Sequence, residues 1–327
     1  MKHFAVRHKN NLLLFAIVVI MWFGLSLIFD NFGSAAQLNY ILLQSAFLGI
    51  AAAGQNLIML TGGIDLSCGN MIALSGVLFS LFLTKMNIPF VPSLVLATLG
   101  VMAFGFLNGF FIATFRIPPM VMTLSTSTLI MGVELLITNG FPASINYAAF
   151  KNWVTHRSIL GVNNSLLAWI LVAVFMVFFL RKTIMGRKIF FYGSNPLATR
   201  YAGFRDKQIC LFTYTMGSAV FALAGLLLVG YTGQSALNIG DNYQYLSIAA
   251  VVLGGTSVSG GKGSYVGTVA GVLILVMIQS ILVMLNIDYG GQNLAEGLII
   301  LILTVVYATS TIERNRKTAR NATRIGG

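Results

Sequence analysis

The sequence predicts an all-α membrane protein with about ten transmembrane helices. Of the 327 residues, 57% are hydrophobic and only 9% are charged, whereas soluble domains carry about 25% charged residues. Apolar segments of roughly 20 residues, the length that a helix needs to cross a bilayer, recur along the chain. The 34 glycines and 6 prolines suit close helix packing and broken or irregular helix ends. Alternating strands of an outer-membrane barrel are not predicted.

Each predicted helix is an apolar segment bounded by polar or glycine-rich residues. The segment at Tyr245 is short and runs into Gly254-Gly255, so a re-entrant turn is the alternative there. The first segment could instead be a secretory signal, but its length favours a retained span. The ten segments are Leu12–Phe29, Leu38–Leu60, Leu66–Leu83, Phe90–Phe115, Met120–Ile137, Leu166–Leu180, Leu211–Val229, Tyr245–Val258, Tyr265–Leu285 and Leu294–Tyr307.

Lysine and arginine residues are distributed unevenly over the two sides that ten spans define. Seventeen of the 20 fall on the side of both termini, and the other three are Lys85, Lys151 and Arg157. Positive charge gathers on the cytoplasmic side of membrane proteins, so both termini are expected in the cytoplasm. The net charge of +12 therefore indicates orientation in a lipid membrane and no nucleic-acid partner. We expect residues 1–327 to form one transmembrane domain.

The cytoplasmic loop 181–209 carries a compact helix signal. Its stretch RKTIMGRKIFFYGSNPLATRYAGFRDK contains seven of the 20 basic residues. Asn195 can accept an N-cap hydrogen bond, Pro196 suits the first helical position, and Gly203 can end the helix in the left-handed conformation. A helix over Pro196–Ala202 is too short to be stable alone, so we expect it to dock against a soluble partner. The alternative is a solvated basic loop. The docking candidates are Ser194, Asn195, Pro196, Leu197, Arg200 and Gly203.

Two glycine-rich turns, Thr61–Asn70 and Leu253–Gly263, share a frame of paired glycines followed by a serine and another glycine. Irregular backbone at membrane depth is tolerated only where protein or a wet cavity satisfies its polar groups. Both turns are therefore expected near a transport pathway, the alternative being ordinary helix ends with flexible turns. The pathway candidates in these turns are Gly62, Gly63, Asp65, Ser67, Gly254, Gly255 and Ser259.

Polar residues near or within the spans are further pathway candidates. Capping of the following helix is the leading interpretation of Asp65, and a gating or substrate contact is the alternative. The hydroxyls that follow Pro118-Pro119 either bind neighbouring helices or face a polar cavity. Glu134 is costly if it lies at membrane depth, and otherwise it sits near the outer boundary. The candidates from this part of the chain are Thr123, Ser125, Thr126 and Glu134.

The sequence predicts no catalytic, metal or cofactor site. It lacks the pattern GxxxxGK[ST], which cradles the phosphates of ATP. The three histidines, His3, His8 and His156, are scattered without the spacing of metal ligands. Cys68 and Cys210 are interpreted as small buried residues.

Four blocks carry a resemblance to a known family. They are LTGGIDLSCGNMIALSG (60–76), IPPMVMTLSTSTLIMG (117–132), GRKIFFYGSNPLATRYAGF (186–204) and IAAVVLGGTSVSGGKGSYVGT (248–268). Together they resemble the permease of the ribose-type, simple-sugar family of bacterial ABC importers. The resemblance implies an inner-membrane permease paired with a second copy or a sister permease. It also implies two cytoplasmic ATPase subunits, and a periplasmic or tethered substrate-binding protein. Asn195–Gly203 matches the family's ATPase-coupling segment.

The sequence departs from this family at three positions. The family usually has Gly where Ser125 and Ser194 stand, and Arg near Met131. The resemblance therefore implies import of a simple sugar or similar small polar solute, with the particular solute open. Two other classes stay open from the residues alone. One is a self-sufficient secondary transporter with an ion relay of intramembrane acids, and the other is a non-transporting scaffold or sensor.

Overall fold

The structure is a computed structural model that describes residues 2–144, 147–159, 161–288, 290–299 and 301–302. Within these ranges the fold is helical apart from two short strand pairs. Eight helices of this part of the chain are long and apolar enough to cross a membrane. The protein is thus an all-α polytopic membrane protein, as predicted, with eight of the ten expected spans found among the described residues.

Most helices coincide with the predicted apolar segments. The described elements are, in chain order, α1 (Lys2–Ile28), α2 (Ala35–Met59), α3 (Cys68–Ser80), the π-helical turn η1 (Leu81–Lys85), α4 (Phe90–Phe115), α5 (Pro119–Thr138), β1 (Ala143–Ser144), α6 (Ala148–Thr155), β2 (Arg157–Ile159), β3 (Val162–Asn163), α7 (Asn164–Lys182), α8 (Ile184–Ser194), α9 (Pro196–Tyr201), α10 (Asp206–Thr232), β4 (Gln234–Ser235), α11 (Asp241–Leu253) and α12 (Tyr265–Met284). Both strand pairs, β1 with β4 and β2 with β3, are antiparallel.

Two segments differ from the sequence prediction, and a third lies partly outside the described residues. The segment predicted as a span over Tyr245–Val258 is α11, which has only 13 residues and is shorter than the roughly 20 that a span requires. Its end at Leu253 follows from the glycine pair, since Gly255 has a φ of 84°. The last predicted span, Leu294–Tyr307, runs beyond the described residues. Helix α8 lies in a segment that was expected to be a loop. The loop was expected because the basic residues of this segment are typical of a solvated connection.

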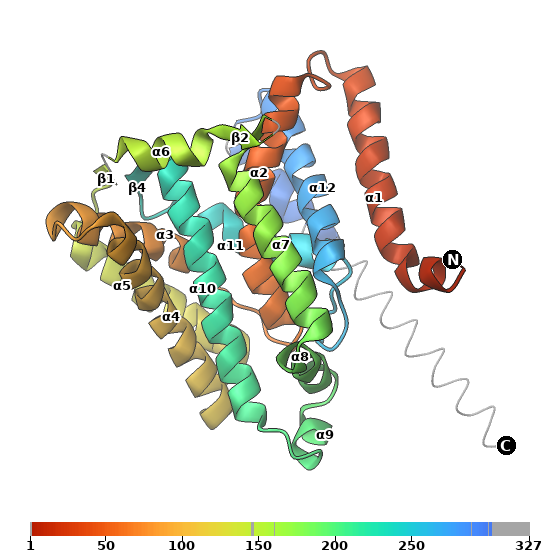
Figure 1. Cartoon of the computed structure of the whole chain (residues 1–327), viewed down its shortest axis with the longest axis vertical. Helices are drawn as coiled ribbons and strands as arrows, with labels where there is room; N and C mark the ends of the chain where they lie inside the picture. The colour runs from red at the N-terminus through yellow and green to blue at the C-terminus, as the bar shows by residue number, and fades with distance from the viewer. Residues whose placement is uncertain (1, 145–146, 160, 289, 300, 303–327) are drawn as a thin grey trace. The chain divides into compact units, whose positions relative to one another are not determined.

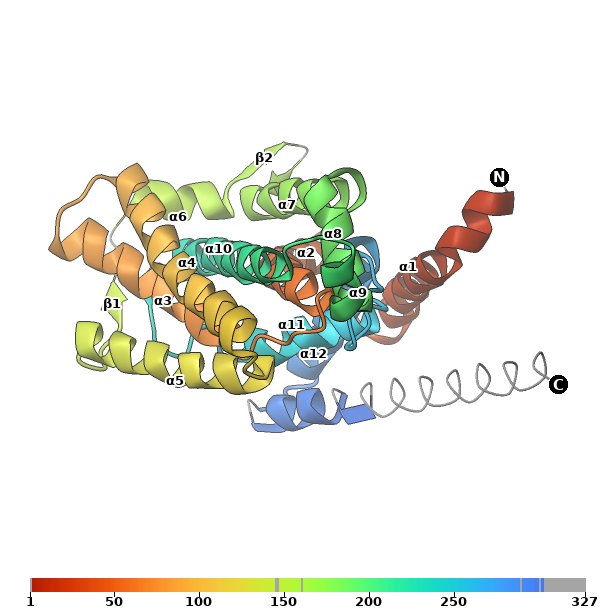
Figure 2. The ribbon, with the colours of Figure 1, turned by 90° about the horizontal axis from the view of Figure 1, so that it is seen from below.

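The chain forms two compact units, Met1–Met277 and Ile278–Gly327. In the first unit α10 packs against α2, α3 and α4. Figures 1 and 2 show α10 and α2 in the middle of this unit, with α3 and α4 on one flank and α7 on the other. Helices α8 and α9 lie at one end, and α6, β1 and β4 lie at the opposite end (Figure 1). In the second unit the amide of Gln279 donates to Glu296 Oε1 over 2.7 Å.

Small residues allow these helices to approach one another closely. A Cβ at Gly54 of α2 would lie 2.7 Å from the carbonyl oxygen of Gly217 in α10. A Cβ at Gly109 of α4 would lie 2.8 Å from the Cα atom of Leu211, which also belongs to α10. Glycine at such crossings lets backbones pack without the hydrophobic driving force that water supplies to soluble proteins. Helix α10 can therefore contact three neighbours along most of its length.

One buried hydrogen-bond chain joins three helices of the first unit. Trp169 Nε1 of α7 donates to Tyr265 Oη of α12 over 2.8 Å. The Tyr265 hydroxyl donates in turn to the Gly49 carbonyl of α2 over 2.7 Å. Tyr265 is 1% exposed, so water cannot replace the hydroxyl if it is removed.

Tyr265→Phe is expected to lower stability, because it leaves the Trp169 N–H and the Gly49 carbonyl without this partner. A buried unsatisfied group costs about 1–3 kcal/mol. The measurement is the thermal unfolding midpoint of the purified protein in detergent. Tyr201→Phe is the control, since Tyr201 is 89% exposed and should leave the midpoint unchanged. Equal midpoints for the two variants would contradict this role of the Tyr265 hydroxyl.

Candidate functional site

Two adjacent amide side chains of α2 each hold one glycine-rich turn. With its amide oriented to match the backbone, Gln55 donates to the Asp65 carbonyl (3.3 Å) and accepts from the Asp65 N–H (3.2 Å). The amide of Asn56 donates to Thr256 Oγ1 (2.7 Å) and Thr268 Oγ1 (3.0 Å). Gln55 and Asn56 are fully buried. The first amide therefore binds the turn before α3, and the second binds the turn that joins α11 to α12.

A second polar network surrounds the start of α3. Asp65 Oδ1 accepts from the Ser67 N–H over 2.8 Å and also from the Ser67 hydroxyl. Asn108 of α4 donates to Ser67 Oγ over 3.2 Å and accepts from Thr126 Oγ1 of α5 over 2.6 Å. These four side chains are at most 1% exposed. The network thus joins α3, α4 and α5 inside the first unit.

The structure corrects one interpretation of Asp65. The N-cap of α3 is Ser67, so Asp65 does not cap the helix directly. It instead binds the amide and hydroxyl of the capping residue, and its second oxygen, Oδ2, has no hydrogen-bond partner among the described residues. Thr123 supports the same turn, since its hydroxyl accepts from the Leu66 N–H over 3.0 Å. Asp65, Ser67, Thr123 and Thr126, which sequence reasoning selected separately, therefore lie together.

Two other predicted residues of α5 lie apart from this network. Ser125 is on the exposed face of the helix, where its hydroxyl donates to the Val121 carbonyl over 2.9 Å. Glu134 is fully buried, and neither of its carboxylate oxygens has a hydrogen-bond partner among the described residues. No group of three or more His, Cys, Asp or Glu suited to a metal ion occurs in the described part of the chain.

The two glycine-rich turns and the end of α8 meet through their backbones. The Gly261 N–H donates to the Leu60 carbonyl over 2.9 Å. A Cβ at Gly193 would lie 2.5 Å from Gly261 N and still closer to the Leu60 oxygen. A Cβ at Gly260 would lie 2.6 Å from Gly62 N and 2.9 Å from the Gly193 oxygen. We call this contact among Leu60–Gly62, Gly193 and Gly260–Gly261 the backbone junction.

The docking segment, α8 with α9 and residues 202–204, folds as the sequence predicts around α9. Asn195 Oδ1 accepts the capping hydrogen bond from the Ala198 N–H over 2.9 Å, and Pro196 is the first helical residue. Gly203 follows the helix with a φ of 79°. The predicted helix over Pro196–Ala202 is thereby confirmed to within one residue.

The chain after α9 folds back onto α8. The Phe204 ring packs edge-on against Phe191, with ring centroids 5.9 Å apart, and Lys188 Nζ lies 5.4 Å from the Phe204 centroid. The Arg200 guanidinium donates to Asp206 Oδ2 over 3.1 Å through Nε, and this hydrogen bond raises the pKa of Arg200. The end of the docking segment is thus packed against α8 within it, and α9 is tied to the start of α10.

The outer face of α9 is apolar and uncovered in the single chain. Leu197 is 64% exposed and Tyr201, one helical turn later, is 89% exposed. A groove of about 300 Å³ separates α9 from the turn between α4 and α5. Its lining includes Arg116, Pro119, Tyr192, Pro196, Leu197 and Arg200. Large exposed apolar side chains beside a groove are typical of a protein interaction site.

The described residues form a helical bundle with broken helices, buried polar networks and a short exposed helix at one end. Sequence comparison identifies the family. Residues 37–308 match the family described as "Branched-chain amino acid transport system / permease component". The chain belongs to this family of permease components.

Curated relatives match nearly the whole chain. The probable ABC transporter permease protein YphD of Escherichia coli K12 is 32% identical over 98% of this chain and 96% of its own length. The ribose import permease protein RbsC of the same strain is 33% identical over 93% of this chain and 94% of its own. The autoinducer 2 import system permease protein LsrC of Escherichia coli K12/DH10B is 32% identical over 88% and 84%, respectively. No solved structure gives a significant match.

Sequence reasoning missed several residues of this site. Asn108, Thr256 and Thr268 complete the two polar networks, and Gly193 completes the backbone junction. An amide such as Asn108 within an apolar helix is the one signal that could have indicated a buried partner. Gly193 carries no such signal, because its importance comes from segments that are distant in sequence.

Gly193→Ala is expected to destabilise the protein, because the added methyl group would meet backbone atoms of Leu60 and Gly261, which no side-chain rotation can relieve. Overpacking of this kind costs about 1–3 kcal/mol. The control is Gly132→Ala in α5, where a Cβ meets nothing within 4 Å. Alanine there should be neutral or slightly stabilising, since it favours a helix over glycine. Unfolding midpoints in detergent give both results, and a stable Gly193→Ala would contradict the tight junction.

Proposed function

We propose that the chain is the membrane-spanning subunit of an ATP-driven importer that carries a simple sugar or a similar small polar solute across the bacterial inner membrane. The observation that carries the proposal is the backbone junction, which connects the exposed docking segment to both glycine-rich turns. Relatives named as importers of ribose and of autoinducer 2 support the solute class. The family description, which names branched-chain amino acids, gives the second solute class to test.

The proposed partners follow from what the chain exposes and lacks. Separate cytoplasmic ATPase subunits would bind α9 through Leu197 and Tyr201, since the sequence has no P-loop of its own. A periplasmic or tethered binding protein would deliver solute at the opposite end, near α6. This assignment places the docking segment in the cytoplasm, in agreement with the distribution of basic residues. Both termini lie on the same side in this proposal, which requires α11 and the glycine-rich turn after it to cross the bilayer together. Residues 1–327 would act as one permease domain.

A second permease copy, or a sister permease, would cover the exposed face of α5. This face carries the hydroxyls of Ser125 and Thr128, each of which donates to a carbonyl of its own helix. Hydroxyls satisfied in this way are tolerated in an apolar interface and remain able to bind a polar solute. Ser125 is not part of the buried polar network. In this arrangement its hydroxyl would face the pathway from the interface between the two permease subunits.

The proposed mechanism is a rigid transfer of movement. When ATP binding moves the ATPase subunits, α9 and α8 move together because the Phe204 ring packs against Phe191 of α8, while Arg200 ties α9 to Asp206 of α10. Gly193 then displaces Leu60–Gly62 and Gly260–Gly261, which it contacts through backbone atoms. The displacement changes the turns that Gln55 and Asn56 bind. The pathway would open beside these turns, at Gly62, Gly63, Asp65, Ser67, Gly254, Gly255 and Ser259, and at Thr123, Thr126 and Glu134 of α5.

Uptake is expected to require the ATPase and to survive loss of the proton gradient. The test is solute uptake by vesicles that contain the permease with its ATPase and binding protein, measured with ribose and with leucine. Glu134→Gln should retain insertion and ATP-driven uptake, because neither carboxylate oxygen accepts a hydrogen bond from the described residues. Uptake that continues without ATP, and that fails with a proton uncoupler or in Glu134→Gln, would instead indicate a secondary transporter.

Gly203→Val is expected to uncouple transport with little loss of membrane protein. The φ of 79° costs a residue with a Cβ about 1–2 kcal/mol, so the end of α9 should shift while the bundle is unchanged. Leu197→Asp should likewise weaken ATPase binding by removing an exposed apolar contact. The measurements are membrane abundance, ATPase co-purification and hydrolysis stimulated by the binding protein.

Gly140→Val is the matched control for backbone strain. Gly140 also has a positive φ, 81°, and a Cβ there would meet nothing nearer than 4.0 Å, but it lies beyond the far end of α5. It should preserve ATPase association. Full ATPase association and full stimulated hydrolysis in both Gly203→Val and Leu197→Asp would show that this segment does not bind the ATPase and is only a solvated connection.

A further inference from the structure

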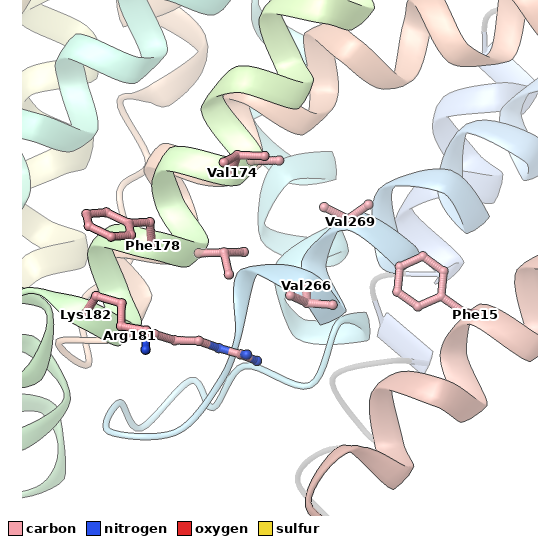
Figure 3. A pocket seen from close by; sticks show the side chains of 9 residues that line it. Phe15, Val174, Phe178, Arg181, Lys182, Val266 and Val269 are labelled. Carbon is pink, nitrogen blue, oxygen red and sulfur yellow. The ribbon is translucent and has the colours of Figure 1, made fainter. Parts of the chain in front are cut away.

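An apolar groove with two cations at one end lies between α1, α7 and α12. Its volume is about 490 Å³, within the roughly 300–1,000 Å³ typical of small-molecule sites. Figure 3 shows Phe15 of α1 facing Val266 and Val269 of α12, with Val174 on α7 across the groove. Ala173, Val177 and Phe178 complete the apolar lining.

Arg181 and Lys182 form the polar end of this groove. They are the last two residues of α7, and Figure 3 shows Arg181 reaching toward the start of α12 below Val266. Both side chains are exposed, and neither has an acidic partner among the described residues. The groove is therefore apolar along its length and positively charged at its end, so a matching ligand has a hydrocarbon body and an anionic head.

The dimensions of the groove match one leaflet of a bilayer. From Ala173 to Lys182 the helix rises by about 14 Å, at 1.5 Å per residue, and half of a hydrocarbon core is about 15 Å. A partner helix fits less well. A cylinder of about 10 Å diameter fills roughly 120 Å³ per residue, so the groove would hold only about one helical turn.

Helix α1 leaves this space open because it touches the bundle at one end. The Asn11 amide donates to Ser264 Oγ over 3.2 Å, just before α12 begins. Beyond that contact no residue of 11–28 is buried. Phe15, one turn after Asn11, faces the groove (Figure 3). The anchored end of α1 and the two cations thus lie at the same end of the groove as the docking segment.

We propose that this groove binds one anionic phospholipid of the cytoplasmic leaflet. An acyl chain lies along Val174, Val266 and Val269, and the phosphate is bound by Arg181 and Lys182. The assignment of leaflet rests on the proposed function, which places the docking segment in the cytoplasm. Only Thr183 separates Lys182 from α8. The bound headgroup therefore also stabilises the position of the start of α8, where the docking segment begins.

The test is the lipid retained by the purified full-length permease after exchange into vesicles of equimolar phosphatidylglycerol and phosphatidylethanolamine. Native mass spectrometry counts the lipids of each kind. Wild-type protein should retain phosphatidylglycerol in preference. Basic residues at a membrane surface contribute about 1 kcal/mol each toward anionic lipid, so Arg181→Gln with Lys182→Gln should lower the preference roughly thirtyfold. Arg187→Gln with Arg205→Gln, two cations outside the groove lining, is the control and should keep the preference.

A second pair of variants tests the apolar part of the groove. Val174→Trp should fill the groove and lower retention of phosphatidylglycerol. Leu171→Trp, on an equally exposed part of α7 that does not line the groove, should not; Val174 and Leu171 are 63% and 70% exposed. Both changes are at the surface, so folding should be preserved in each. Equal retention in the two tryptophan variants would overturn the proposal.

Two further results would contradict the proposed lipid site, and a third experiment tests whether a second permease occupies the groove. Equal retention of the two lipids by wild-type protein, or an unchanged preference in the Arg181 and Lys182 variant, would overturn an anionic lipid site. Oxidation of Val174→Cys is expected to leave the protein uncross-linked, since Cys68 and Cys210 are buried. A disulfide between two copies would show a second permease in the groove instead. The readouts are independent of transport, so lipid binding in a chain that does not couple to an ATPase would contradict the proposed function alone.

Discussion

The structure depends on satisfying irregular backbone without water. Lipid offers no hydrogen bonds, so a broken helix survives only where protein groups replace them. Gln55 binds the backbone of the first turn, while Asn56 anchors the second turn through Thr256 and Thr268. Adjacent residues of a helix point about 100° apart, which lets one helix serve turns on two sides. This explains why α2 is buried along most of its length and why the surrounding helices are arranged around it and α10.

The second consequence of the turns is that they bring distant segments of the chain into backbone contact. Residues near 60, 193 and 260 come from the turn after α2, the end of α8 and the α11–α12 connection, and each close approach involves a glycine. The docking segment is therefore continuous, through covalent and van der Waals contacts, with the parts of the bundle that hold buried polar residues. In the proposed function, movement of the exposed helix would therefore change the buried turns at the same time, as a transport subunit driven by a separate ATPase requires.

Sequence reasoning succeeded where the physical signal is local. The bounds of α4 and α12 match the predicted segments to within one residue, because apolar length alone defines a span. The cap of α9 was also predictable, since Asn195, Pro196 and Gly203 each act within one turn. Asp65, Ser67, Thr123 and Thr126 were selected but not paired, because their connection passes through Asn108 of α4. Gly193 was not predictable, since nothing local distinguishes a glycine that contacts remote backbone from one in open space.

The backbone junction also has a mechanical character that side-chain interfaces lack. Side chains can change rotamer and so absorb a displacement of an ångström or more, whereas peptide groups in direct contact have no such freedom. Gly193, Leu60 and Gly261 meet through peptide groups. A displacement of one of these segments therefore cannot be taken up by a side-chain rotation at the contact. If an ATPase drives the docking segment as proposed, a small displacement there would therefore reach both glycine-rich turns with little loss.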